Sequence, residues 1–169
     1  ELEDIYLPYR PKRRTRATIA RERGLEPLAD IIFEQRESDI YTIAEKYISE
    51  AVPSVEEAIC GASDIIAERV SEDEYARNVV RRSFARYGVI KSKIIKGKEA
   101  DGIKFSDYYE AEAQVARVSS HRLLAMMRGE EEGYLRLSIS VEPEYIMDQL
   151  SRHFIKHNSA TREYMSAAI

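Results

Sequence analysis

The 169-residue sequence contains few pairs of side chains whose spacing would suit chemistry on a substrate. His153 and His157 are four residues apart, a spacing at which two imidazoles on one helical face can chelate a metal. No HExxH glutamate and no third ligand accompanies them, so we expect no metal there. Ser120 and His121 could suggest a nucleophile with its base. Because adjacent helical residues point in different directions, we expect His121 instead to anchor a helix start by hydrogen bonding.

Motifs that hold nucleotides, metals or catalytic nucleophiles are absent from the sequence. It has no Gly-rich phosphate loop, no dinucleotide fingerprint, no Cys/His zinc pattern and no G-x-S-x-G elbow. The single cysteine, Cys60, lies within an apolar helical stripe, where we expect a small buried side chain. These observations predict a protein that is not an enzyme and that requires no cofactor.

Cationic residues form the most informative pattern, because they are concentrated along the chain. The net charge is −4, yet residues 77–98 contain eight basic residues and no acidic residue. Sorting of charge in this way predicts a locally positive surface on an acidic body. The candidate binding residues in this stretch are Arg77, Arg81, Arg82, Arg86, Lys91 and Lys93.

The arginines of this stretch should share one side of a helix. At about 100° per residue they fall on the half opposite to Phe84 and Tyr87. We therefore expect both aromatic rings in the core rather than in a base-stacking platform. The cations would support phosphate contact without base recognition. The bound partner of such a surface could be nucleic acid or protein. The alternative is a solvated helix face opposed by acidic neighbours on adjacent helices or on a further domain.

Residues 10–16 form a second basic stretch, whose flanking prolines prevent a continuous helix. Arginine forks in a stiff, non-helical segment suit phosphate oxygens. Alternatively, these side chains bridge helices by pairing with nearby carboxylates such as Glu22, Glu26 and Asp30, and the sequence leaves both interpretations open. The candidates are Arg10, Lys12, Arg13, Arg14 and Arg16.

Helices dominate the elements that must position these residues, because apolar residues recur at helical spacing through most of the chain. Two alternating segments, 89–96 and 134–141, predict strands that pair with each other. The expected fold class is mainly α, a multi-helix domain with one small two-stranded antiparallel β element. The predicted helices cover 15–23, 26–34, 39–50, a segment from 54, 71–88, 119–127, 143–157 and a segment from 160.

Three helix boundaries can be predicted in detail. Ser54 and Ser71 each stand three residues before a glutamate, so each is predicted to cap a helix. Gly129 is predicted to end the helix that begins near Ser119, and residues 130–133 are predicted to form an acidic loop.

The composition is typical of a globular domain, with 44% hydrophobic and 33% charged residues. No apolar run approaches the roughly 20 residues that span a bilayer, and the acidic start does not resemble a signal peptide. Together with the single cysteine, this predicts a cytoplasmic protein without membrane contact. The chain begins with Glu1 and is expected to be a piece of a longer protein. Two lobes are expected, 1–88 helical and 89–169 helical with the strand pair.

Three blocks of sequence resemble the bacterial Tex family of transcription accessory proteins. The first is LEDIYLPYRPKRRTRATIARE at residues 2–22, followed by GLEPLA at 24–29. The second is GKEA at 97–100 with KFSDYY at 104–109, and the third is VSSHR at 118–122 with MRG at 127–129 and EGYLRL at 132–137. The sequence departs from the family pattern at Ser119, where the family usually has proline, and in its more acidic segment Glu130-Glu131-Glu132.

The resemblance implies the N-terminal helical region, residues 1–169, of an S1-domain-containing RNA-binding protein. In the family this region precedes a nuclease-like YqgF domain, helix-hairpin-helix elements and an S1 domain, on which RNA binding largely depends. The implied role is a non-enzymatic scaffold that adds a basic surface for RNA or DNA, with RNA polymerase or transcription factors as possible protein partners. The alternative is a protein-interaction module without nucleic-acid contact.

Overall fold

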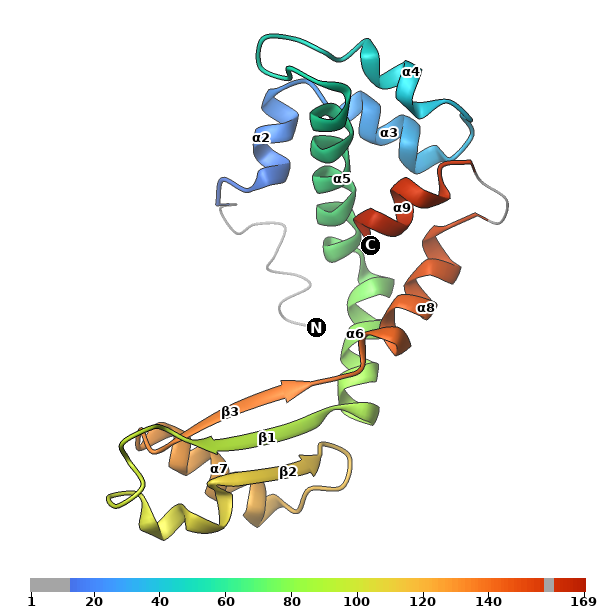
Figure 1. Cartoon of the computed structure of the whole chain (residues 1–169). Coiled ribbons are helices and arrows are strands. Elements are labelled where there is room, and N and C mark those ends of the chain that lie inside the picture. The colour runs from blue at the N-terminus through green and yellow to red at the C-terminus, as the bar shows by residue number, and fades with distance from the viewer. Residues whose placement is uncertain (1–12, 157–159) are drawn as a thin grey trace. The chain divides into compact units, whose positions relative to one another are not determined.

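The computed structural model describes residues 13–156 and 160–169, and it is mainly helical (Figure 1). In chain order the elements are α2 (Arg16–Glu22), α3 (Glu26–Glu34), α4 (Ile40–Glu45), α5 (Val55–Glu72), α6 (Glu74–Tyr87), β1 (Val89–Ile94), the 3-10 helix η2 (Ile103–Tyr108), β2 (Glu110–Gln114), α7 (Ser120–Glu131), β3 (Leu135–Ser140), α8 (Pro143–Phe154) and α9 (Arg162–Ala168).

Contacts divide the chain into two compact units. The helical unit comprises the residues up to Asn78 together with Met147–Ile169, and the sheet unit comprises Val79–Ile146. Both α6 and α8 contain residues of both units. The sequence interpretation instead divided the chain between residues 88 and 89, where the helical period changes to a strand period.

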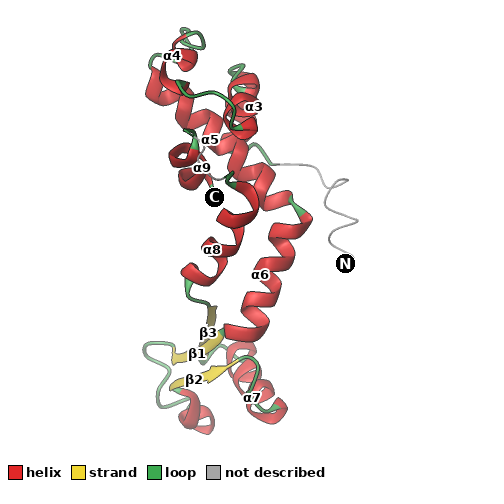
Figure 2. Cartoon of the chain, turned by 90° about the vertical axis from the view of Figure 1, so that its right-hand side faces the viewer, coloured by secondary structure: helices red, strands yellow, loops and turns green. Residues whose placement is uncertain are grey.

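Helix α5 is the centre of the helical unit, and α2, α3, α4 and α9 pack around it. The last three of these helices are labelled near α5 in Figure 2. The helix begins at Ser54, whose hydroxyl accepts a hydrogen bond from the Glu57 amide at 3.2 Å, as predicted. Its buried stripe includes Ala58, Ala62, Ile65 and Ile66. Burying such an apolar stripe against several helices supplies the main stabilisation of this unit.

Cys60 is exposed, so the prediction of a buried thiol was wrong. Cys60 follows Ala58 by two positions, which places it about 200° around the helix from the buried stripe. Its neighbour Gly61 is the residue that approaches the core. A Cβ at Gly61 would overlap the Cδ1 atom of Leu25, which is fully buried.

The sheet unit contains a three-stranded antiparallel sheet in the order β2-β1-β3. The pairing of β1 with β3 was predicted, and it aligns Lys91 with Ser138 and Lys93 with Arg136. The prediction of only two strands was wrong, because β2 pairs with the other edge of β1. The sequence of β2, EAEAQ, consists of residues that are depleted in strands. The strand conformation of this segment is therefore stabilised by its pairing with β1 and by the burial of Ala111, and not by the local preference of its residues.

Helix α7 packs against β3 in the sheet unit. The prediction that Gly129 ends this helix was wrong. Gly129 lies inside the helix, which continues to Glu131. Gly129 is buried against Leu135, which is 1% exposed. The absent side chain is therefore a packing requirement and not a stop signal. Glu130 and Glu131, which were assigned to an acidic loop, are helical.

The start of α6 also differs from the prediction. Asp73, and not Ser71, caps this helix, because its carboxylate accepts a hydrogen bond from the Ala76 amide at 2.9 Å. The Ser71 hydroxyl donates to the carbonyl oxygen of Glu68 within the last turn of α5. Aspartate and serine are similarly good caps, so the sequence alone could not choose between them.

Candidate nucleic-acid interface

The described residues of the first basic stretch lie at the start of α2 and mostly pair within the chain. Arg14 Nη2 is 2.9 Å from a carboxylate oxygen of Glu22, and Arg16 Nε is 3.5 Å from Asp64 Oδ1. Arg13 is exposed. The remaining candidates of this stretch, Arg10 and Lys12, lie outside the described residues.

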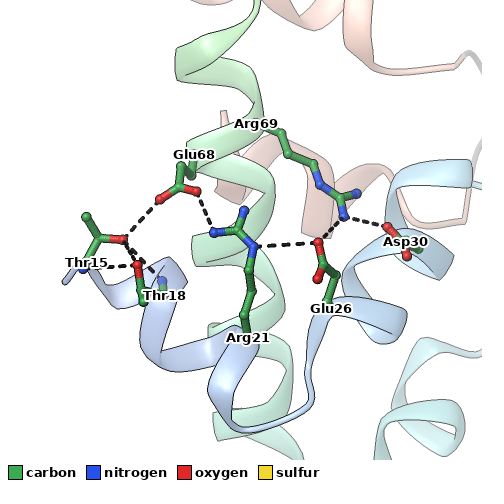
Figure 3. A network of polar contacts seen from close by, with 7 residues as sticks. All are labelled: Thr15, Thr18, Arg21, Glu26, Asp30, Glu68 and Arg69. Atoms are coloured by element: carbon green, nitrogen blue, oxygen red, sulfur yellow. Dashed lines mark hydrogen bonds and ion pairs between the residues drawn. The ribbon is translucent and has the colours of Figure 1, made fainter. Parts of the chain in front are cut away.

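A network of charged side chains joins α2 and α3 to α5 (Figure 3). Arg21 Nη1 of α2 donates to Glu68 of α5 at 2.6 Å, and the Thr15 hydroxyl donates to the same carboxylate at 3.0 Å. Arg69 of α5 reaches Asp30 of α3 at 2.5 Å and Glu26 at 3.4 Å. The hydrogen bond to Glu68 is the main cause that raises the pKa of Arg21 above its usual range.

This network uses the carboxylates that were considered as partners for residues 10–16. Glu26 and Asp30 pair with Arg69, while Glu22 pairs with Arg14. The cations of α2 and α5 therefore bridge helices. This pairing leaves less positive charge available for phosphate groups than their number suggests.

The arginines of α6 lie in different environments. Arg77 is half-buried, whereas Arg81, Arg82 and Arg86 are exposed. Arg77 and Arg81 each interact with another group of the chain. Among the described residues, Arg82 has no ion-pair partner. The Arg86 guanidinium lies 5.2 Å from the ring centroid of Tyr87, which is a cation–π distance.

The two candidate lysines lie on the same face of β1, because they alternate with the buried residues Ile90 and Ser92. Lys91 Nζ is 3.0 Å from Glu112 of β2, its partner in the strand register. Lys93 is exposed and lies between Glu110 of β2 and Arg136 of β3. The glutamates of β2, which the sequence interpretation did not place here, thus partly neutralise this face.

Charge is nevertheless sorted between the two units. The sheet unit has 12 basic and 10 acidic residues, a net charge of +2, while the residues of the helical unit have 14 basic and 20 acidic residues, a net charge of −6. Phosphate groups would therefore be favoured at the sheet unit over the helical unit.

A pair of stacked tyrosines at the end of α6 is a feature that sequence reasoning missed. Tyr87 and Tyr145 have ring centroids 4.6 Å apart and planes inclined by 14°. Tyr87 is 39% exposed and Tyr145 is 50% exposed, so the prediction of a core position for Tyr87 was wrong. Tyr87 occupies the last position of α6, where no following turn covers its ring. The two tyrosines are 58 positions apart in the sequence, so no local pattern of residues indicated the pair.

A pocket of about 440 Å³ opens beside this pair. Tyr87 contributes to its wall, and the other lining residues come from the exposed side of the sheet and from the segment that follows β3: Val89, Lys91, Glu112, Ser140, Val141, Glu142 and Pro143. It combines an aromatic ring, a paired lysine and carboxylate, and a hydroxyl. These groups can stack on a flat ring and exchange hydrogen bonds with its edge.

The two histidines that the structure describes, His121 and His153, each contact a neighbouring side chain. His121 Nε2 lies 3.4 Å from the hydroxyl of Ser119 at the start of α7. His153 stacks on Tyr75 with ring centroids 3.9 Å apart, and His157 lies outside the described residues. Within residues 13–156 and 160–169, no three His, Cys, Asp or Glu side chains are grouped as a metal site requires. No helix of this described part has the length and apolar character that crossing a membrane requires.

Comparison with known proteins identifies similar sequences along most of the chain. Residues 35–168 match a family model described as "Tex central region-like". The "Transcriptional accessory protein Tex" of Neisseria gonorrhoeae is 40% identical over 143 residues, and "Protein tex" of Bordetella pertussis is 41% identical over 145 residues; each alignment covers 85% of this chain. The "S1 RNA-binding domain-containing protein 1" of Pongo abelii is 24% identical over 97% of the chain. The chain spans 19%, 18% and 17% of the lengths of these relatives, respectively.

Proposed function

Because this chain belongs to the Tex family, whose central-region model matches residues 35–168, we propose that it is a non-enzymatic scaffold segment of a cytoplasmic transcription accessory protein. We further propose that its sheet unit contacts RNA or DNA through exposed cations. The names of two relatives support a role in transcription, and the name of a third, an S1 RNA-binding protein, supports association with nucleic acid.

The observation that carries the nucleic-acid proposal is the set of exposed cations in the sheet unit. Arg82 and Lys93 have no ion-pair partner among the described residues, and Arg86 is held only over an aromatic ring. A phosphate group that approached these side chains would not have to displace a carboxylate. Arg14 and Arg16, by contrast, would have to leave Glu22 and Asp64.

A second candidate function is docking of a protein partner without nucleic-acid contact. Leu124 and Met127 lie three residues apart on α7 and are 64% and 51% exposed. Residues at this spacing lie on the same side of a helix, so the two side chains form an apolar strip. Such a strip suits a protein partner better than it suits phosphate groups.

Charge reversal of the sheet unit separates these two functions. We expect the double variant Arg82→Glu/Arg86→Glu to bind a fluorescent single-stranded oligonucleotide roughly 10-fold or more weakly at low salt, because favourable phosphate contacts become repulsive. Fluorescence anisotropy measures this affinity.

The matched control is Arg23→Glu/Arg162→Glu, which changes the net charge equally at two exposed arginines of the helical unit. This control should lose much less affinity. Equal losses in both variants would mean that only net charge matters. The absence of any binding by the unsubstituted chain would leave the protein-docking function.

A further inference from the structure

The aromatic stack of the sheet unit is exposed to solvent. Tyr87 and Tyr145 lie in a near-parallel stack, yet large fractions of both side chains remain in contact with solvent. A buried aromatic ring removes 150–250 Å² from water, so a stack that is left exposed forgoes much of that stabilisation. An exposed platform of this kind is suited to a further flat ring.

The surroundings of the stack favour a base over an aliphatic or an anionic group. Arg86 lies over the Tyr87 ring and positions a cation beside the stack. Lys91 and Glu112 line the adjacent pocket as a neutralised pair, and Glu142 adds a carboxylate. A phosphate group would be repelled by Glu142, whereas the amino groups of a nucleobase can donate hydrogen bonds to carboxylates.

We propose that Tyr145 stacks with an unpaired base of single-stranded nucleic acid, extending the Tyr87–Tyr145 stack by one ring. The base edge faces the pocket lined by Glu112, Ser140 and Glu142, and the strand's phosphates lie toward Arg82, Arg86 and Lys93. This inference rests on the proposed nucleic-acid function and adds the strand type and the contact that selects it.

Single strands are the class that this geometry selects. The faces of paired bases inside a duplex are already stacked on their neighbours, so they cannot reach an exposed tyrosine without leaving the helix. Unpaired bases present both faces, and stacking on aromatic side chains tolerates any sequence. A duplex would then bind only through its phosphates and would be insensitive to Tyr145.

A tryptophan at position 145 tests the stack directly, because the chain contains no tryptophan of its own. We expect the emission of the Tyr145→Trp variant to be quenched in a saturable manner by 12-nucleotide oligo(U) or oligo(dT). A fully paired DNA duplex with the same number of phosphates should quench the tryptophan emission much less. The matched control is Tyr75→Trp, because Tyr75 is also an exposed stacked tyrosine but belongs to the helical unit.

Affinity measurements complete the test. The Tyr145→Ala variant should bind the single strands on the order of 10-fold more weakly, as expected for the loss of one base stack, and Tyr145→Phe should retain most of the affinity because it keeps the ring. Circular dichroism of each variant checks that the fold is kept. If Tyr145→Ala does not fold, Tyr145→Phe and Tyr145→Trp, which retain an aromatic ring at this position, still test the proposal.

The outcomes distinguish the stack from the underlying function. Salt-sensitive binding to single strands and duplex alike, with no quenching at position 145 and no loss in Tyr145→Ala, would overturn the stacking proposal and leave the phosphate-binding function. Absence of binding by the unsubstituted chain would overturn both. Equal quenching of the tryptophans at 75 and 145 would also overturn the specific role of Tyr145.

Discussion

Replacing Leu135 with alanine is expected to destabilise the sheet unit by about 2–5 kcal/mol, as for other fully buried leucines. Leu135 is 1% exposed and packs directly over Gly129 of α7. A Cβ at Gly129 would overlap Leu135 Cδ1 and would lie 2.8 Å from Leu135 Cγ and 3.2 Å from Phe105 Cδ1. Gly129→Ala alone should therefore cost about 1–3 kcal/mol through overpacking, even though alanine is the better helix former.

The double variant Gly129→Ala/Leu135→Ala should lose less free energy of unfolding than the sum of the losses of the two single variants. The methyl group at position 129 fills part of the space that the leucine leaves, so the two substitutions couple. Urea unfolding gives the free energies, and hydrogen exchange of amides in α7 and β3 assigns the change to the sheet unit. Strictly additive losses would contradict the packing of Gly129 against Leu135.

Removing the carboxylate of Glu68 is expected to have the second large effect, in the helical unit. The side chain is 13% exposed and accepts hydrogen bonds from Arg21 and from Thr15. Glu68→Ala would leave the guanidinium of Arg21, whose side chain is 30% exposed, without its main partner. The expected loss is about 1–3 kcal/mol, between the values for exposed and for buried ion pairs.

Comparison among substitutions separates the charge from the packing of Glu68. Glu68→Gln keeps the shape and an acceptor oxygen, so it should lose less stability than Glu68→Ala. The control Glu37→Ala removes an exposed glutamate of the same unit that lies outside the helices, and it should change the free energy of unfolding by about 0.5 kcal/mol or less. Equal stability of Glu68→Ala and Glu37→Ala in urea unfolding would show that the network in Figure 3 contributes little.

Local sequence signals predicted those parts of the fold that depend on local physics. The α3 boundaries, the Ser54 cap of α5 and the pairing of β1 with β3 follow from capping chemistry and periodicity. Strand β2 did not, because its alanines and glutamates have no preference for strands and its pairing depends on residues about 20 positions earlier. Gly129 was misread for a related reason, since a glycine that ends a helix and one that makes room for a leucine look alike in a sequence.

The candidate interface was less accessible to sequence reasoning than the fold. The concentration of cations in residues 77–98 was evident, but the partners of individual cations were not. Lys91 meets Glu112 only because β2 pairs with β1, and Arg86 meets an exposed ring only because Tyr87 ends its helix. The stack of Tyr87 on Tyr145 joins residues near the beginning and the end of the sequence segment that forms the sheet unit. Such pairings depend on topology, and no local pattern of residues encodes them.

The salt dependence of binding to a single-stranded oligonucleotide tests most directly whether the sheet unit contacts phosphate groups. For the unsubstituted chain, the logarithm of the association constant should fall linearly with the logarithm of salt concentration. Each lost phosphate contact on a single strand should flatten the slope by roughly 0.7, so Arg82→Ala/Arg86→Ala/Lys93→Ala should flatten it by about 2. The control Arg23→Ala/Arg36→Ala/Arg162→Ala, in the helical unit, should leave it nearly unchanged. A slope that is the same in the unsubstituted chain and in both variants would contradict a phosphate-contacting surface on the sheet unit.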